Sequence, residues 1–326
     1  MLAHSVKQST FPGVHWRFLL IGAGRYARST IASAVKLLLG RKTHYTAHDV
    51  LFRQYLGRLM GFDTLRAITS AHSPREGAGS QALMAMFAIR FAREQGMAYV
   101  HTPFAHIHHG DRPAGEWAAA WESHFNLGKG ETREAASPVN YALTCSEIDD
   151  LFADKDPRPF DEALRAEFRR KYYADKTPRS KAALSVCVHV RHRNRYDFPD
   201  PDVADLAQLA IVVKRLRETL AAGGLAYELR IFSQGVAADF AGLAADSSEL
   251  CLDADPIWTM RELVEADLLI TTAGTFSYVA GLLCDGAVLA DPRQFPLQPD
   301  WQPYDERGTF DQAVLQQRLE KMLSRS

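Results

Sequence analysis

Between residues 184 and 290, short apolar segments alternate with longer amphipathic ones, and this alternation constrains the fold more than any other feature of the chain. Short apolar runs bounded by turn residues are typical of buried strands, and a 3.6-residue period is typical of helices. The pattern predicts strands at 184–190, 226–232, 248–252, 267–271 and 287–290, and helices at 203–222, 236–244, 257–265 and 276–284. Strands that alternate with helices form parallel sheets, so we expect a doubly wound α/β domain.

The first half of the chain shows the same alternation less regularly. It predicts strands at 66–71 and 97–102, a helix at 81–96 that Gly96 ends, and a helix at 116–127. Residues 150–182 are dense in charge and contain three prolines, which favours a domain junction. We therefore expect one Rossmann-like domain at 1–170, a second at 171–308, and a terminal amphipathic helix at 309–326. A capping box of Thr309 and Gln312 opens that last helix.

The amino-acid composition indicates the broad class of protein to which the chain belongs. Of the 326 residues, 47% are hydrophobic and 24% are charged, and the net charge is -1, as in ordinary soluble globular proteins. A dedicated nucleic-acid-binding protein would have a strong basic excess, so we expect no nucleic-acid partner. The 4 cysteines form no Cys-x-x-Cys pair, which indicates reduced thiols rather than a zinc site or a disulfide framework.

Basic residues gather at the start of the chain. Residues 1–48 contain Lys7, Arg17, Arg25, Arg28, Lys36, Arg41 and Lys42, and no Asp or Glu. Such a segment is either a solvated face or a surface for anionic lipid or a phosphate-bearing substrate. No apolar run approaches the roughly 18 residues of a membrane span. We therefore expect a cytoplasmic protein, with peripheral contact at the inner face of the membrane as the alternative.

Two motifs suggest cofactors that their surroundings do not support. Gly22, Gly24 and Ala27 follow an apolar run like a dinucleotide fingerprint, but the segment after them is basic and helical, and Asp49 is the first acid. The cluster HIHH supplies His106, His108 and His109, which could share a metal ion, yet only Asp111 is near enough to complete the site. A loop of proton-transfer groups at a strand end is the interpretation we favour.

Polar groups gather at the ends of two predicted strands. The stretch SVCVHVRHRN runs from a buried strand directly into Arg191, and strand 267–271 runs into TTAGTFS, a helix start rich in hydroxyls. Carboxyl ends of parallel strands meet at one edge of a sheet, so Arg191 and residues 275–277 can converge on one anion. A plain N-cap by Thr275 is the alternative for the helix start.

The turn REGAGSQ, residues 75–81, precedes another predicted helix. Its glycines, Gly77 and Gly79, would let the backbone approach a ligand closely, next to the free N–H groups of the helix. A tight turn that needs glycine for steric reasons alone is the alternative.

Three motifs in order resemble the α-1,2- and α-1,6-fucosyltransferases, especially the nodulation-type chitooligosaccharide enzymes. HVRHRN, residues 189–194, is similar to their His-Val-Arg motif, and EGAGSQ to their Gly-x-Gly-x-Gln helix. IFSQG and DLLITTAGTFSYVAGLL are similar to their Phe-Ser-Asp strand and Ser-x-Phe-Ser element. The resemblance covers residues 66–292. Arg193 departs from the family's Gly or Thr, Asn194 from its frequent Asp, and no acid follows Ser233.

The resemblance implies a GT-B-like α/β fold of two Rossmann-like domains, with the acceptor in the first, a nucleotide sugar in the second, and the active site in the cleft between them. It implies that Arg191 is catalytic and contacts the β-phosphate of a GDP-sugar. The other donor-site residues that it implies are His189, Asn194, Ser233, Thr275, Phe276, Ser277, Gly77, Gly79 and Gln81.

The implied reaction moves fucose, or a related sugar, from GDP to a glycan hydroxyl with inversion, using no cofactor beyond the donor and no essential metal. The expected partners are thus a nucleotide-sugar donor and a glycan acceptor, as in surface polysaccharide or oligosaccharide synthesis. The acceptor needs a base. The candidates are Asp197, His108 and Glu116, followed by Asp111, Glu76, His106 and His109.

Two other function classes stay open. Asp253 and Asp255 formally supply the Asp-x-Asp pair of a metal-dependent transferase that uses another nucleotide sugar. A non-catalytic protein that binds a nucleotide or a glycan would keep the fold without the reaction.

Overall fold

The computed structural model describes residues 66–72, 76–105, 107, 112–132, 141–143, 160–192, 203–243, 248–293 and 295–324. Contacts divide the chain into two compact units, one built from 1–71, 87–102 and 130–156, the other from 72–86, 103–129 and 157–326. Each unit is discontinuous in sequence. The domain boundaries expected from the sequence stay a prediction.

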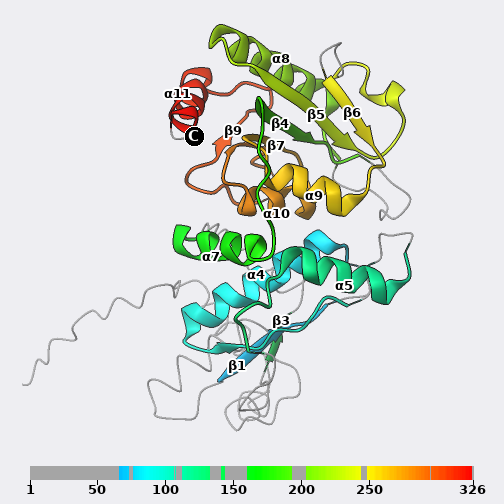
Figure 1. Cartoon of the computed structure of the whole chain (residues 1–326), viewed down its shortest axis with the longest axis vertical. Helices are drawn as coiled ribbons and strands as arrows, with labels where there is room; N and C mark the ends of the chain where they lie inside the picture. Colours follow the sequence, from blue (N-terminus) through cyan, green and yellow to red (C-terminus); the bar gives the residue numbers. More distant parts are fainter. Residues whose placement is uncertain are drawn as a thin grey trace, which may run out of the picture. The chain divides into compact units, whose positions relative to one another are not determined.

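The larger unit contains a six-stranded sheet in which every pair of neighbours is parallel (Figure 1). Its order is β6-β5-β4-β7-β8-β9. The strands are β4 (Leu184–His189), β5 (Tyr227–Ser233), β6 (Ser248–Leu252), β7 (Leu268–Thr271), β8 (Ala287–Ala290) and β9 (Gln302–Pro303). The chain builds outward from β4 to β6, then returns to place β7 beside β4. The order therefore reverses between β4 and β7, which is the switch point of a doubly wound fold.

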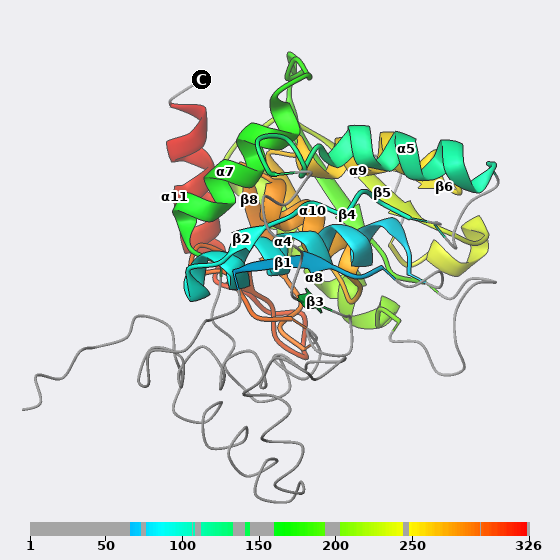
Figure 2. The same ribbon diagram turned by 90° about the horizontal axis from the view of Figure 1, so that it is seen from below.

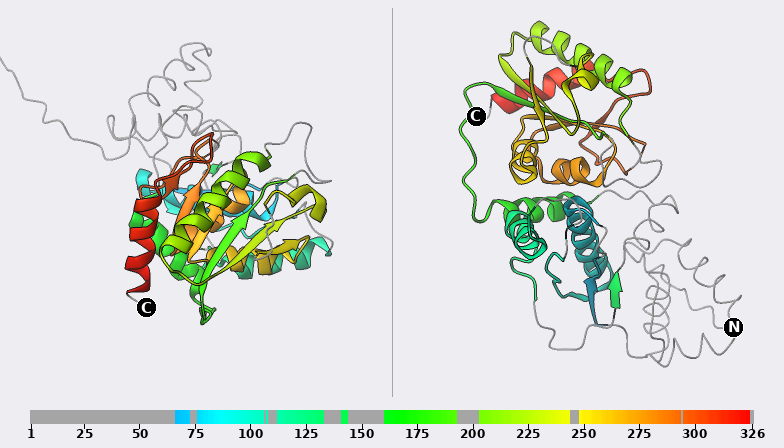
Figure 3. Two further views of the ribbon diagram at one scale, coloured as in Figure 1. Left: turned by 90° about the horizontal axis from the view of Figure 1, so that it is seen from above. Right: turned by 90° about the vertical axis from the view of Figure 1, so that its right-hand side faces the viewer.

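Helices cover both faces of this sheet (Figures 1 and 3). Helices α8 (Leu206–Ala222) and α11 (Gln312–Leu323) lie on one face, and α9 (Pro256–Val264) and α10 (Thr275–Leu283) lie on the other. Strand β4 shows how the sequence sets this arrangement. Its residues Val186 and Val188 belong to the core under α8 and α11, whereas the Cys187 thiol points the other way and donates to the Glu262 carbonyl of α9. A strand buried on both faces needs apolar residues at nearly every position.

More helices of the larger unit pack on the outer side of α9 and α10. They are α7 (Glu162–Tyr173), α5 (Ala114–Phe125) and the first half of α4 (Ala78–Gln95), seen from below in Figure 2. An aromatic cluster holds α5 and α7 together, with the rings of Trp121, His124, Phe125 and Tyr172 in contact. Burial, and after it the charge of Lys176, lowers the pKa of His124 to about 3, so this histidine is neutral at physiological pH.

The smaller unit contains a three-stranded parallel sheet of order β2-β1-β3. Its strands are β1 (Ala67–Ser70), β2 (Ala98–Tyr99) and β3 (Tyr141–Leu143), and the second half of α4 runs between the first two along the chain. Side-chain hydroxyls at the strand ends join these strands, as between Thr69 and Thr102. A second parallel sheet agrees with the alternation seen in the first half of the sequence.

The α/β class with parallel sheets is confirmed. Strands β6 and β8 have the predicted bounds, and the strand at 66–71 and both early helices lie where the pattern placed them. Gly96 ends α4 with a φ of 65°, the left-handed conformation expected of a C-terminal glycine. In the described residues, no helix is long and apolar enough to cross a membrane.

Two local predictions are wrong. The segment 236–244 is a short 3-10 helix at Ala237–Phe240, not an α-helix. Thr309 and Gln312 form no capping box, because α11 begins two residues later than predicted and the Asp311 carboxylate caps it at the Val314 N–H. The charge-dense segment 150–182 contains α7, in which Leu164, Phe168 and also Arg165 are buried.

Candidate functional site at the sheet switch point

Arg191 lies at the switch point, just beyond the carboxyl end of β4. Next to it along this edge, β7 ends and residues 272–274 turn the chain into α10. Ligands of doubly wound proteins bind outside the carboxyl ends of the strands at the point where strand order reverses. The topology therefore predicts that a functional site lies at this edge of the sheet.

The start of α10 offers unused backbone donors. Its N-cap is Gly274, which has a φ of 112°, and the first intrahelical bond runs from the Tyr278 N–H to the Gly274 carbonyl over 3.3 Å. The N–H groups of Thr275, Phe276 and Ser277 precede that bond, so the helix itself does not satisfy them. The expected cap by Thr275 is wrong, because this residue is the first of the helix and no side chain caps it.

The start of α4 meets the start of α10. A Cβ atom added to Gly79 would lie 2.8 Å from both the nitrogen and the Cα of Phe276, so only glycine allows this approach. The hydroxyls of Ser80 and Thr275 are hydrogen-bonded at 3.1 Å. The first intrahelical bond of α4 runs from Gln81 to Gly77, so this helix also begins with free donors.

The two helices thus bring the positive ends of their dipoles together, and an arginine lies beside them. A Cβ on Gly274 would lie 3.4 Å from the Cδ of Arg191, so the side chain of Arg191 runs along the first residues of α10. Like ends of two helix dipoles repel each other, and an anion between them removes that cost. This arrangement favours a phosphate or diphosphate.

His189 adds a neutral polar group to the same edge. Its ring lies against that of Phe276, with centroids 5.2 Å apart and planes tilted by 31°. Burial, and after it the charge of Arg191, lowers the pKa of His189 to about 3. Its Nδ1 atom is buried without a hydrogen-bond partner among the described residues. A buried polar atom with no partner is a candidate ligand contact.

Other predicted donor-site residues have structural partners here. Ser277 is fully buried, and its hydroxyl donates to the Thr272 carbonyl at 3.0 Å. Ser233 donates to the Val190 carbonyl at 2.9 Å. Gln81 is also fully buried, and its side-chain oxygen accepts from the Ala105 N–H at 3.0 Å. These three side chains hold the site's backbone in place, and Gly77 supplies the carbonyl that starts α4.

The candidate bases are largely outside the described residues. Asp197, Asn194 of the donor motif, His106, His108, His109 and Asp111 all lie there, as do Gly22, Gly24, Ala27 and the basic segment 1–48. Glu116 is exposed in the first turn of α5, and Glu76 lies just before α4. The structure therefore brings together Arg191 and the starts of α4 and α10 but does not choose the base.

Asp255, from the Asp-x-Asp alternative, is engaged in other contacts. Its carboxylate caps α9 by accepting from the N–H groups of Ile257 and Trp258, and it pairs with Arg112 at 2.6 Å. Among the described residues, no group of three or more His, Cys, Asp or Glu side chains is arranged to hold a metal ion. The contacts of Asp255 thus argue for a helix cap rather than a metal ligand.

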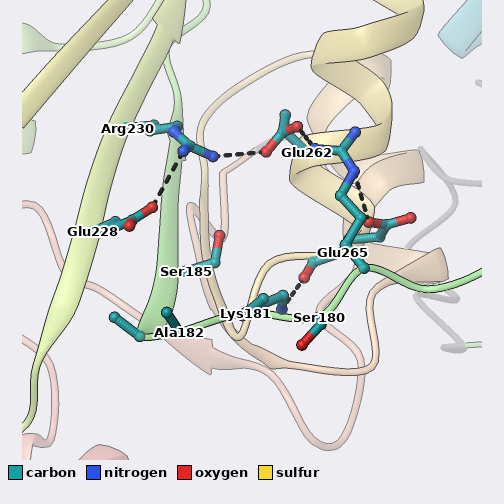
Figure 4. Close-up of a pocket in the computed structure, with 10 residues that line it drawn as sticks. Ser180, Lys181, Ala182, Ser185, Glu228, Arg230, Glu262 and Glu265 are labelled. Carbon is teal, nitrogen blue, oxygen red and sulfur yellow. Dashed lines mark hydrogen bonds and ion pairs between the residues drawn. The ribbon is translucent and has the colours of Figure 1, made fainter.

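A pocket of about 230 Å³ lies at the opposite, amino edge of the sheet (Figure 4). It lies between β5, α9 and the connector that leads into β4, and Arg230 reaches across it to Glu262 at 2.9 Å. Arg179 of the connector pairs with Glu262 as well. Lys181 pairs with Asp267 at 2.8 Å and donates to the Glu265 carbonyl. Cations and carboxylates here neutralise one another, so the pocket is a structural ion-pair network.

Sequence reasoning missed two residues of the site. Thr272 holds the backbone of Arg191, and Gly274 makes room for its side chain. Both lie inside the quoted stretch TTAGTFS, but hydroxyl and glycine residues after a strand are common in plain turns. No signal in one sequence distinguishes the two cases.

The described part of the chain is therefore an α/β protein whose doubly wound parallel sheet brings Arg191 and the N-termini of two helices together at its switch point. No family model matches the chain, and no curated protein matches it in sequence.

The fold is loosely similar to several solved structures. A UDP-forming α,α-trehalose-phosphate synthase from Burkholderia xenovorans has 10% identity and a TM-score of 0.33, over 96% of this chain and 79% of that one. An E. coli heptosyltransferase with ADP-2-deoxy-2-fluoro heptose has 11% identity and a TM-score of 0.33, over 79% and 98%. A putative UDP-N-acetylglucosamine 2-epimerase from Listeria monocytogenes has 11% identity and a TM-score of 0.30, over 84% and 74%.

Proposed function

We propose that this protein is a GT-B-like glycosyltransferase that uses a nucleoside diphosphate sugar as donor. The observation that carries the proposal is the meeting of two helix starts at Gly79 and Phe276, with Arg191 beside them at the sheet switch point. Breaking a sugar–phosphate bond leaves a diphosphate whose charge must be neutralised. Free N–H donors and a guanidinium fixed in advance can do this.

We further propose GDP-fucose, or a related GDP-sugar, as the donor and a glycan hydroxyl as the acceptor. Support comes from the motif HVRHRN and from the two other motifs that resemble fucosyltransferases in the same order. In this proposal Arg191 contacts the β-phosphate, and the first N–H groups of α10 and α4 bind the remaining oxygens. His189 is neutral and partly buried, and its buried Nδ1 atom is available for a hydrogen bond with a hydroxyl of the donor sugar.

Inversion and metal independence belong to the same proposal. A direct displacement needs a base for the acceptor hydroxyl, and Asp197, His108 and Glu116 are the candidates. The role of Asp255 as cap and partner of Arg112 supports a site that neutralises the diphosphate without a metal. We also propose a cytoplasmic protein, with segment 1–48 as the part that could meet an anionic membrane surface.

The test is a nucleotide screen followed by a transfer assay. We expect GDP alone to raise the unfolding temperature, because a ligand that binds only the folded state stabilises it. We then expect transfer from GDP-fucose to a chitooligosaccharide to continue in EDTA, with inversion seen by NMR of the product. Stabilisation only by UDP with Mn²⁺, or only by NAD, overturns the proposal. GDP binding without any sugar transfer leaves a non-catalytic nucleotide-binding protein.

A further inference from the structure

The hydrogen-bond ladder between β4 and β7 stops before Arg191. Its last pair is Val188 with Ile270. β7 itself ends one residue later, at Thr271, and the chain then turns into α10 at Gly274, which has a φ of 112°. The backbone at 189–191 thus needs other partners on this side.

The hydroxyl of Thr272 supplies them. Its Oγ1 accepts from the Arg191 N–H at 2.8 Å and donates to the His189 carbonyl at 3.0 Å. One side chain therefore makes the two bonds that a further residue of a paired strand would make. Thr272 is 6% exposed, so these bonds are shielded from water and leaving them unmade would be costly.

The opposite side of the same backbone is held by β5. The Val190 N–H donates to the Phe232 carbonyl at 2.9 Å, and the Ser233 hydroxyl donates to the Val190 carbonyl at 2.9 Å. The peptide between Val190 and Arg191 is therefore held at its carbonyl by Ser233 and at its N–H by Thr272, and the Arg191 carbonyl accepts from the Ala204 N–H at 2.8 Å.

Thr272 is also tied to the start of α10. Its carbonyl accepts from the hydroxyl of Ser277, which is fully buried in the first turn. One residue therefore connects the backbone of Arg191 to the helix whose N–H groups lie beside it. A shift at Thr272 would move the two anion-binding groups relative to each other.

We propose that Thr272 is a positioning residue that sets Arg191 against the free N–H groups of α10. This inference rests on the proposed function, because it assigns Thr272 to the donor site. Thr272 acts through Arg191 and contributes no charge of its own.

The test compares Thr272→Val with Thr272→Ser. Valine keeps the shape and removes both bonds, whereas serine keeps the hydroxyl. We expect Thr272→Val to weaken GDP binding in calorimetry about tenfold, and to lower turnover with GDP-fucose by at least as much, because small misplacements of catalytic groups are costly. We expect Thr272→Ser to stay within about threefold of the wild type for both.

Thr219→Val is the matched control. Thr219 is 4% exposed on α8, donates to the Arg215 carbonyl at 2.8 Å and accepts from Gln312 at 3.0 Å. It resembles Thr272 in burial and bonding but lies on the other face of the sheet. We expect similar losses of stability in both valine variants, and a loss of GDP affinity only in Thr272→Val. Equal GDP affinity in the two valine variants overturns the proposal.

Amide hydrogen exchange separates this inference from the proposed function. We expect Thr272→Val, and not Thr219→Val, to speed exchange of the Arg191 N–H at least about tenfold, since the amide loses its acceptor. A wild-type protein that does not bind GDP refutes the proposed function. The positioning role then stands or falls on this exchange result alone.

Discussion

The amino and carboxyl edges of the six-stranded sheet differ in how their charged groups are arranged. At the amino edge, Arg230 and Arg179 meet Glu262, so each charge has an opposite charge beside it. At the carboxyl edge, two positive helix ends meet at Gly79 and Phe276, with Arg191 beside them. Compensated charges hold a structure together, whereas two helix N-termini that converge favour an anion between them.

The pocket and the candidate site are therefore in different places. The described pocket of about 230 Å³ lies at the edge where the charges are already paired. Its ion pairs tie the connector at 176–183 to α9, and the hydroxyls of Ser233 and Thr272 tie down Arg191 at the other edge. The hollow therefore lies where cations and carboxylates pair, whereas Arg191 and the two helix starts come together at the edge away from it.

The largest expected effect is a loss of activity from a substitution at the carboxyl edge. Arg191→Ala should lower sugar transfer at least about 100-fold, and Arg191→Lys should do nearly the same, because only the guanidinium fork grips two phosphate oxygens. The unfolding temperature should change little. The assay is initial-rate transfer from GDP-fucose, with Arg318→Ala on α11 as the control. A folded Arg191→Ala protein with near-wild-type turnover would end the hypothesis.

One added methyl group is expected to disrupt the contact between the first residues of α4 and α10. Gly79→Ala would place a Cβ 2.8 Å from the backbone of Phe276, so the helices must separate. We expect a loss of about 1–3 kcal/mol in stability and weaker GDP binding. The control is Gly115→Ala on α5, where a Cβ meets nothing within 4 Å. Chemical unfolding and calorimetry check both, and equal behaviour of the two variants contradicts the prediction.

At the amino edge the expected effect is on stability alone. Glu262→Ala removes a carboxylate whose side chain is 5% exposed and leaves Arg230 and Arg179 without it. We expect a loss of about 1–2 kcal/mol, because both arginines are exposed enough for water to replace part of the interaction. GDP affinity should not change. Glu249→Ala, which removes a 62% exposed partner of Arg230, should cost under about 0.5 kcal/mol. A loss of GDP affinity in Glu262→Ala would contradict the division between the edges.

The expected effect that spreads over the widest range of conditions is a pH dependence of stability at the carboxyl edge. The pKa of His189 is lowered from 6.5 to about 3 in the folded protein, so below pH 6.5 the unfolded chain binds the extra proton. Stability should fall as the pH drops from about 6.5 toward 3, by at most about 1.4 kcal/mol per pH unit for this residue. His124 contributes in the same direction.

The variant His189→Phe measures how much of this pH dependence of stability comes from His189. Its unfolding free energy between pH 7 and 4 should fall less steeply than that of the wild type, and His124→Phe should show a similar reduction. If His189→Phe keeps the full wild-type slope, the pKa of this histidine is not lowered in the folded protein.

Much of the larger unit could be predicted from the sequence. Strand 287–290 is a short apolar run between turn residues, and strand 248–252 ends in Leu-Cys-Leu; the predicted bounds of both were correct. The helix α7 was missed because its charged residues conceal Leu164 and Phe168, and its N-cap Asp161 lies in a proline-rich stretch. The 3-10 helix at 237–240 was missed because four residues do not establish a period.

The site was predicted in part. Arg191 and residues 275–277 could be expected at one edge because carboxyl ends of parallel strands always share an edge. The contact of Gly79 with Phe276 could not, since it joins residues far apart in the chain. The roles of Ser277, Ser233 and Gln81 as structural donors and acceptors also depend on neighbours that the sequence does not name.

The sequence by itself determined the period of each segment, and hence an α/β protein with Arg191 at a strand end. Period and composition are local, so they fix which residues form strands and which face they bury. The tertiary structure alone decided that β7 lies beside β4 and that α4 and α10 meet at their starts. Those outcomes depend on packing between distant segments, where a missing Cβ or one buried hydroxyl determines which groups can come together.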